Sequence, residues 1–166
     1  MSLVQTAGGY MLASDAGEAV WFNGGLVLLK ATGAQTAGTF GVIELRARQG
    51  FASPLHVHQN DDEIFVVLEG DVRFQLGEAV TEATDGALVY GPREVGHAFR
   101  VDSPEARLLL IFGPAGTEGF FKEAGKPAPS VQLPPLDEVF LDRDALMEVA
   151  ARYHQRFVGP PLPPKA

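Results

Sequence analysis

Three of the chain's four histidines and one glutamate lie at spacings that could form a metal site. His56 and His58 are two residues apart, so their side chains would project from the same face of a β-strand. Glu63 follows a polar turn and begins the next apolar run, and His97 belongs to a separate run. Imidazole suits Fe, Ni, Cu and Zn, and a carboxylate adds a hard, anionic ligand. If the four side chains converge, they would hold one first-row transition metal ion.

These spacings resemble the two sequence motifs of the cupin superfamily. The first motif, G-x5-H-x-H-x4-E-x6-G, is matched at every defined position by Gly50, His56, His58, Glu63 and Gly70. The resemblance implies that His56, His58, Glu63 and His97 ligate one divalent transition metal ion per chain. Mixed nitrogen and oxygen ligation is compatible with Fe, Ni, Mn, Co, Cu or Zn, so the sequence leaves the metal open.

The second motif, G-x5-P-x-G-x2-H-x3-N, is matched in part, by Gly86, Pro92 and His97. Glu94 stands where the family usually has glycine, and Val101 where it usually has asparagine. That asparagine is not a metal ligand in the family, so its absence leaves the ligand set intact. We expect Gly96, just before His97, to supply the flexibility of this turn instead.

Composition limits the classes of protein to consider. The 166 residues suffice for one domain with a sizeable core, and 46% hydrophobic with 20% charged residues is ordinary globular composition. A net charge of −8 argues against a nucleic-acid or anionic-membrane partner. The absence of cysteine excludes disulfides and thiolate ligands. Lys30 is the first cationic side chain, so the start lacks the basic region of a signal peptide. We therefore expect a soluble, cytoplasmic protein.

Short apolar runs separated by turn residues predict a sandwich or barrel of many strands. Together with the cupin resemblance, they predict an all-β fold: one double-stranded β-helix, or jelly-roll barrel, with two C-terminal helices. Residues 1–115 would form the barrel, and residues 116–166 a helical extension packed on it within the same domain. The predicted helices are Thr117–Ala124, with Thr117 as N-cap, and Leu141–Phe157. The predicted strands are Tyr10–Leu12, Ala19–Phe22, Leu26–Ala31, Phe40–Arg46, Leu55–His58, Glu63–Leu68, Val72–Leu76, Ala87–Tyr90, His97–Val101 and Ala106–Phe112.

Strand periodicity places aromatic side chains on the same faces as the proposed ligands. If His56 and His58 face inward, the barrel interior is also lined by Phe65, Phe74, Phe99 and Phe112, which would form the wall of a pocket for an apolar small molecule. Ile64, Val66 and Leu68 would then point outward, and an apolar outer face needs a cover. With the family's habit of pairing barrels, this pattern predicts a homodimer.

The C-terminal part is similar to that of single-domain quercetin-dioxygenase-like cupins, on the residues His97-Ala98-Phe99-Arg100 and Phe157-Val158-Gly159-Pro160-Pro161. The resemblance implies a metal-dependent dioxygenase that opens the ring of a flavonol-like aromatic substrate with O2 and releases carbon monoxide. Glu63 would act both as ligand and as the base that accepts the substrate proton. The four phenylalanines would contact the aromatic substrate.

Other functions fit the same residues, because a fold and a metal site do not determine a reaction. One is a non-enzymatic cupin that binds or senses a small molecule. Another is a metal-dependent decarboxylase or isomerase on the same four ligands. A purely structural role is disfavoured because all four ligands are kept. Taken singly, the three motif histidines and Glu63 could also be ordinary surface or turn residues. We expect such an ordinary role for His154. Phe120 and Phe121 could serve packing alone. Metal analysis followed by oxygen-uptake assays would separate these possibilities.

Overall fold

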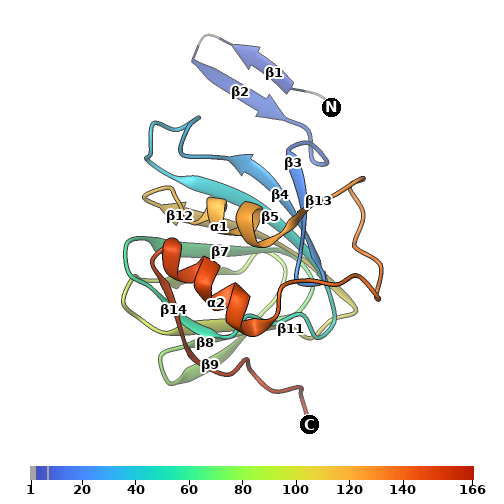
Figure 1. The fold of residues 1–166 in the computed structure, drawn as a ribbon. Helices are drawn as coiled ribbons and strands as arrows, with labels where there is room; N and C mark the ends of the chain where they lie inside the picture. Colours follow the sequence, from blue (N-terminus) through green and yellow to red (C-terminus); the bar gives the residue numbers. More distant parts are fainter. Residues whose placement is uncertain (1–2, 7) are drawn as a thin grey trace.

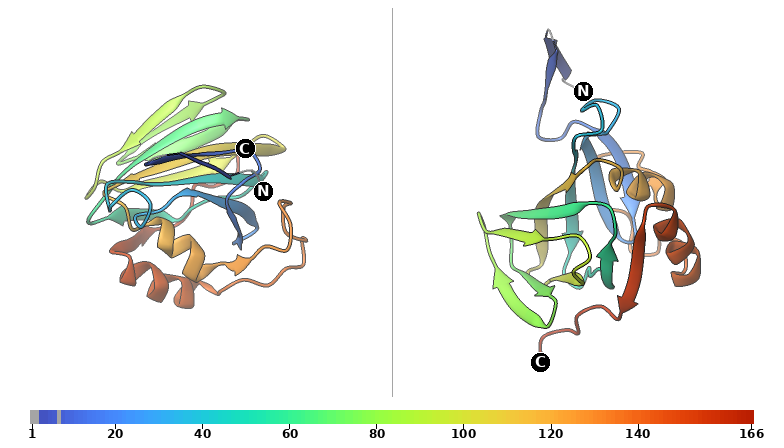
Figure 2. Two further views of the ribbon diagram at one scale, coloured as in Figure 1. Left: turned by 90° about the horizontal axis from the view of Figure 1, so that it is seen from above. Right: turned by 90° about the vertical axis from the view of Figure 1, so that its left-hand side faces the viewer.

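Two antiparallel sheets face each other around a shared apolar core, and both helices lie on one side of them (Figures 1 and 2). The computed structural model describes residues 3–6 and 8–166. In spatial order, the seven-stranded sheet consists of β10 (Leu88–Gly91), β7 (Asp62–Glu69), β12 (Glu105–Gly113), β5 (Gly41–Arg48), β4 (Gly25–Ala31), β3 (Glu18–Phe22) and β13 (Lys126–Pro127).

The five-stranded sheet supplies the other wall. Its spatial order is β14 (Gln155–Gly159), β6 (Leu55–His58), β11 (His97–Val101), β8 (Val72–Leu76) and β9 (Ala79–Ala83). A separate hairpin of β1 (Leu3–Thr6) and β2 (Gly9–Leu12) projects from one end of the molecule (Figure 1). The two-sheet arrangement is a double-stranded β-helix, which confirms the predicted fold class.

Alternation of side chains along the strands produces the core. On β12 the residues Ala106, Leu108, Leu110 and Phe112 are buried while their neighbours are more exposed. Phe65 and Val67 on β7 and Phe74 on β8 are buried from the facing strands. The period of two that predicted the strands therefore also determines which face of each sheet is apolar and inward.

The outer face of the seven-stranded sheet is also apolar near its β10 edge. Val66 of β7 is half-buried, and it stands opposite Leu88 of β10, which is 63% exposed. The next pair in register joins Ile64 to Tyr90, which is 51% exposed. Ile64, Val66 and Leu68 thus point outward as predicted, and they belong to a larger apolar surface that includes β10.

Helix α1 (Glu118–Ala124) agrees closely with its prediction, but its N-terminus does not. Thr117 precedes the helix in α-helical geometry and makes no side-chain capping bond. Its hydroxyl donates instead to the buried carboxylate of Asp61, at 3.1 and 3.2 Å. The prediction that Thr117 caps the helix is therefore wrong, because a buried acceptor from another loop binds its hydroxyl.

The second predicted helix is too long. Helix α2 spans Arg143–Arg152, with the Asp142 side chain accepting from the backbone N–H of Ala145 at 2.9 Å. His154 then adopts a φ of 57°, which ends the helix and reverses the chain. The following residues form β14, which pairs antiparallel with β6. The C-terminal segment therefore adds a strand to the sheet that carries the histidines.

No helix among the described residues is long and apolar enough to cross a membrane.

Candidate metal centre

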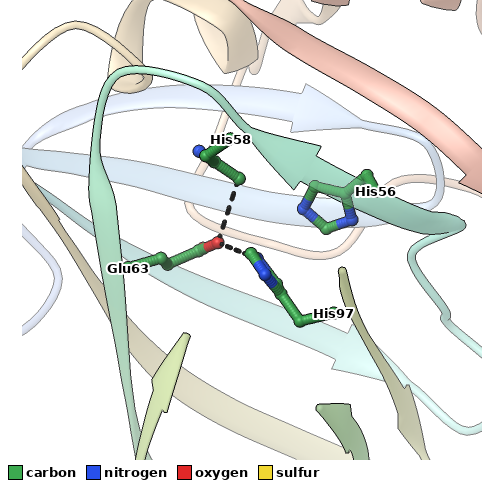
Figure 3. A group of neighbouring side chains, drawn as sticks. All are labelled: His56, His58, Glu63 and His97. Carbon is green, nitrogen blue, oxygen red and sulfur yellow. Dashed lines mark hydrogen bonds and ion pairs between the residues drawn. The ribbon is translucent and has the colours of Figure 1, made fainter. Parts of the chain in front are cut away.

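The four predicted ligands converge inside the barrel from three strands. His56 and His58 lie on β6, Glu63 on β7 and His97 on β11, where His97 stands directly opposite His56. One nitrogen or oxygen from each side chain lies within 4.8 Å of the corresponding atoms of the other three. All four residues are buried, with exposed fractions of 8% or less. Figure 3 shows the side chains pointing toward one another.

The outward-facing nitrogen of each imidazole has its own acceptor. Nδ1 of His56 lies 2.8 Å from the carbonyl oxygen of Pro54, and Nδ1 of His97 lies 3.0 Å from that of Val95. Nδ1 of His58 lies 2.9 Å from Oδ2 of Asp61. A carbonyl or carboxylate oxygen accepts but cannot donate, so each Nδ1 must carry a hydrogen. The three Nε2 atoms are then available as ligands, as is usual for metal-binding histidines.

The inward-facing atoms meet around the Glu63 carboxylate. Its Oε2 lies 2.9 Å from Nε2 of His97 and 3.2 Å from Nε2 of His58 (Figure 3). With Nδ1 protonated on both rings, these Nε2 atoms would present lone pairs to a carboxylate oxygen unless a cation lies between them. A proton or a metal ion can serve. The donor set of three imidazole nitrogens and one carboxylate oxygen thus fits a divalent transition metal.

The pKa values of the two histidines of β6 are shifted in opposite directions. Burial lowers the pKa of His56 to about 3, assisted by the neighbouring imidazoles. Burial also disfavours the charged form of His58, but Glu63 and Asp61 outweigh it and raise its pKa to about 10. Burial alone would raise the pKa of Glu63, yet His58 and His97 hold it well below its ordinary value. Without metal at neutral pH, the site therefore contains an ionised Glu63 beside a protonated His58.

Sequence reasoning did not single out Asp61, which the structure places behind the site. Its side chain is buried, accepts from Nδ1 of His58 and also accepts from the hydroxyl of Thr117. Such a carboxylate fixes the ring orientation and makes the imidazole a stronger ligand. Its position three residues after His58 was the available signal, but the acidic turn that contains it also reads as a solvated loop.

The turn before His97 differs from its prediction. Glu94 itself adopts the left-handed conformation, with a φ of 64°, and its backbone N–H donates to the carbonyl of His58 at 2.8 Å. Gly96 is not among the described residues with positive φ, so the expectation that it replaces the motif glycine is wrong. A residue with a Cβ is strained in this region, and here the hydrogen bond to the β6 backbone holds it.

A narrow cavity of about 50 Å³ lies against the candidate metal centre. His56, His58 and Glu63 line it, together with Phe99 and Phe112 of the predicted aromatic wall. The other two predicted wall residues lie behind this lining in the core, with the rings of Phe65 and Phe74 centred 5.8 and 6.0 Å from that of Phe99. The cavity is further lined by Phe22, Asn23, Leu45, Phe51, Ala52, Ser53, Pro54, Leu110, Thr117, Phe120, Phe121, Leu146, Gln155 and Phe157.

The C-terminal elements contribute to the lining of the cavity. Phe120 and Phe121 of α1 pack edge-on against Phe22, with ring centroids 5.4 and 5.0 Å away, and both also line the cavity. Leu146 of α2 and Phe157 of β14 contribute from the same segment and are only half-buried. The helix carrying Phe120 and Phe121 therefore combines packing with a share of the cavity lining.

Comparisons with known proteins agree with this geometry. Residues 44–112 match the Cupin domain family. Quercetin 2,3-dioxygenase from Bacillus subtilis is 26% identical over 142 residues, which make up 86% of this chain and 42% of that protein. An uncharacterised protein from Streptomyces coelicolor is 34% identical over 53 residues, 32% of this chain and 50% of that protein. The chain thus covers half or less of the length of these two relatives.

Solved structures show the same fold at low sequence identity. An RmlC-like cupin from Shewanella frigidimarina superposes with a TM-score of 0.58 at 15% identity, over 72% of this chain and 99% of that one. KdgF from Halomonas sp. gives a TM-score of 0.53 at 17% identity, over 58% of this chain and 84% of that one. Oxalate decarboxylase from Bacillus subtilis gives 0.53 at 19% identity, over 58% of this chain and 27% of that one.

Proposed function

We propose that this chain, which is a member of the cupin superfamily, is a metal-dependent dioxygenase acting on a flavonol-like aromatic substrate with O2. The observation that carries the proposal is a buried cluster of three histidines and a glutamate at an apolar, phenylalanine-lined cavity. The similarity to a quercetin 2,3-dioxygenase over 86% of the chain supports the choice of substrate class.

We propose that His56, His58, Glu63 and His97 hold one divalent metal ion through Nε2 atoms and a carboxylate oxygen. Bound there, the metal would supply Lewis acidity and a template that brings the substrate hydroxyl and O2 together. The chain's own residues do the rest. The Nδ1 partners keep the rings in place, and Glu63, ionised at neutral pH, can accept the proton that the substrate hydroxyl loses.

The lining of the cavity favours a neutral aromatic ligand. Phe99 and Phe112 would contact the substrate rings, while Phe65 and Phe74 support them from the core. Among the described lining residues there is no lysine or arginine to pair with a carboxylate group. That composition disfavours a decarboxylase for small dicarboxylates, which would have to bury an anion without a cationic partner.

Entry of a flavonol requires the cavity to widen. A cavity of about 50 Å³ is far smaller than the roughly 300–1,000 Å³ of sites that bind drug-sized ligands. Phe121, Leu146 and Phe157 are the half-buried lining residues of the C-terminal segment. We expect rotation of these three side chains to widen the cavity when the substrate enters.

The proposal is tested by oxygen uptake on protein loaded with each candidate metal, using quercetin and 3-hydroxyflavone. Loaded protein should consume O2 and release carbon monoxide. Glu63→Gln should keep much of its metal and lose at least about 100-fold in rate, the usual effect of removing a general base. Glu69→Gln, on the exposed end of the same strand, is the matched control and should keep the rate. Fully loaded protein that consumes no O2 with either flavonol would refute the dioxygenase, and a wild-type rate in Glu63→Gln would remove its role as base.

A further inference from the structure

Gln155 is a buried polar residue on the wall of the cavity. It begins β14 directly opposite His58 of β6 in the antiparallel register, so both side chains project from the same face of the sheet. Side chains paired in this way have Cβ atoms about 4.5–5.5 Å apart. Gln155 is 4% exposed, and it lines the cavity together with His56, His58 and Glu63.

The amide nitrogen of Gln155 has no hydrogen-bond partner. Among the described residues, its Nε2 is the only buried side-chain nitrogen or oxygen without one. Two other polar residues of the cavity lining are engaged, since Thr117 donates to Asp61 and the Ser53 oxygen accepts from the backbone N–H of Phe99 at 3.1 Å. A buried donor left unpaired destabilises the folded protein, so proteins retain few of them. An amide kept at that cost beside a metal site indicates a ligand that completes it.

We propose that Gln155 is a specificity-determining residue, donating an N–H of its side-chain amide to a neutral carbonyl or hydroxyl oxygen of the ligand bound at the candidate metal centre. A neutral donor suits an uncharged oxygen, whereas an anionic group would call for the lysine or arginine that the described lining lacks. The inference rests on the proposed function, because it places the oxygen-bearing edge of the flavonol between Gln155 and the metal ligands.

The test compares Gln155→Met with Gln75→Met, both in metal-loaded protein. Methionine keeps the approximate size of glutamine and removes both amide hydrogens. Gln75 lies on β8, where its amide donates to the carbonyl of Gly77 at 3.0 Å, outside the cavity lining. Affinity for 3-hydroxyflavone, measured by calorimetry, should fall roughly 3- to 10-fold in Gln155→Met and stay unchanged in Gln75→Met. Without ligand, Gln155→Met should unfold at the same urea concentration as wild type or a higher one, because no internal hydrogen bond is lost.

A second probe separates this inference from the proposed function. Acetohydroxamic acid is a small bidentate metal ligand with two neighbouring oxygens, and it should bind loaded wild type more tightly than loaded Gln155→Met. One outcome is that wild type binds acetohydroxamate but no flavonol, and that Gln155→Met binds acetohydroxamate more weakly than wild type does. In that case the flavonol assignment fails and the role of Gln155 stands. If wild type binds both probes and Gln155→Met weakens neither, the role of Gln155 is overturned. Lower stability of ligand-free Gln155→Met would also overturn it, since that result assigns the amide to the fold.

Discussion

Metal binding at this site should release a proton from His58 and should therefore tighten strongly as the pH rises. The Glu63 and Asp61 carboxylates raise the pKa of His58 to about 10, so its ring is protonated at pH 7 and at pH 9 in the metal-free protein. A metal ligand must be deprotonated, so the ion displaces this proton. The apparent affinity should then rise tenfold per pH unit, or about 100-fold from pH 7 to pH 9. With an ordinary imidazole pKa of about 6.5, the rise would be less than about twofold.

The measurement is competition for Ni²⁺ against a chromophoric chelator whose own proton affinity is known. Asp61→Asn removes the carboxylate that accepts from His58 at 2.9 Å, so the pKa of His58 should fall and the rise in affinity should become smaller. Asp62→Asn removes a charge one residue away, from a carboxylate paired with Arg93 at 3.0 Å, and should keep the full rise. A wild-type affinity that changes less than about threefold between pH 7 and pH 9 would refute the reasoning. Equal pH dependence in the two variants would refute the role given to Asp61.

Three further predictions concern stability and assembly. Glu94→Gly should raise the free energy of unfolding in urea by roughly 0.5–1 kcal/mol. The substitution relieves the strain of a left-handed backbone, and this gain exceeds the conformational entropy that glycine loses on folding. A decrease in the free energy of unfolding would contradict this. Hydrogen bonds from Arg73 lower the pKa of Asp102 in the folded protein. The ionised Asp102 therefore stabilises the fold above the ordinary aspartate pKa of about 3.9, and this contribution is lost as the pH falls through the lower folded-state pKa. Asp102→Asn should therefore cost about 1 kcal/mol at pH 7 and progressively less in acid, and an equal cost at all pH values would argue against the pair. We propose a homodimer that forms through the outer face where Leu88 stands opposite Val66. Sedimentation at micromolar concentration should give a dimer for wild type and a monomer for Leu88→Asp. A monomeric wild type would rule out this interface.

The barrel and the ligand cluster could be predicted because their signals are local. Alternation along β6, β8 and β11 gave strands with the observed bounds. His56 and His58 share a face by spacing alone, and the superfamily motif added Glu63 and His97 from other strands. The Nδ1 acceptors of His56 and His97 are equally local, since each is the carbonyl two residues earlier in the chain.

The C-terminal part of the site could not be predicted in the same way. The helical periodicity of the sequence continues from Leu141 to Phe157. Nothing in the composition marks His154 as the residue with positive φ that in fact ends the helix. Strand β14 exists because it pairs with β6, almost a hundred residues earlier in the chain, and such long-range pairing leaves no periodic signal of its own. The predicted helix included Gln155, so the position of this residue on a strand opposite His58 was missed. Asp61 was missed for a different reason, because its hydrogen bond from Thr117 joins two residues 56 positions apart in the chain.

The charges of the described residues give one more reason to expect a neutral substrate. Glu63 and Asp61 are the two buried carboxylates at the site, and imidazoles bound to a metal ion are neutral. A divalent ion would balance the two carboxylates, leaving the buried site without net charge. A hydroxyl-bearing aromatic keeps that balance even if its proton moves to Glu63, because the charge only changes place within the site. A dicarboxylate would leave a net negative charge in an apolar cavity whose described lining has no lysine or arginine, which is costly. The same balance explains why a neutral amide donor such as Gln155, and not a cation, suits the wall opposite His58.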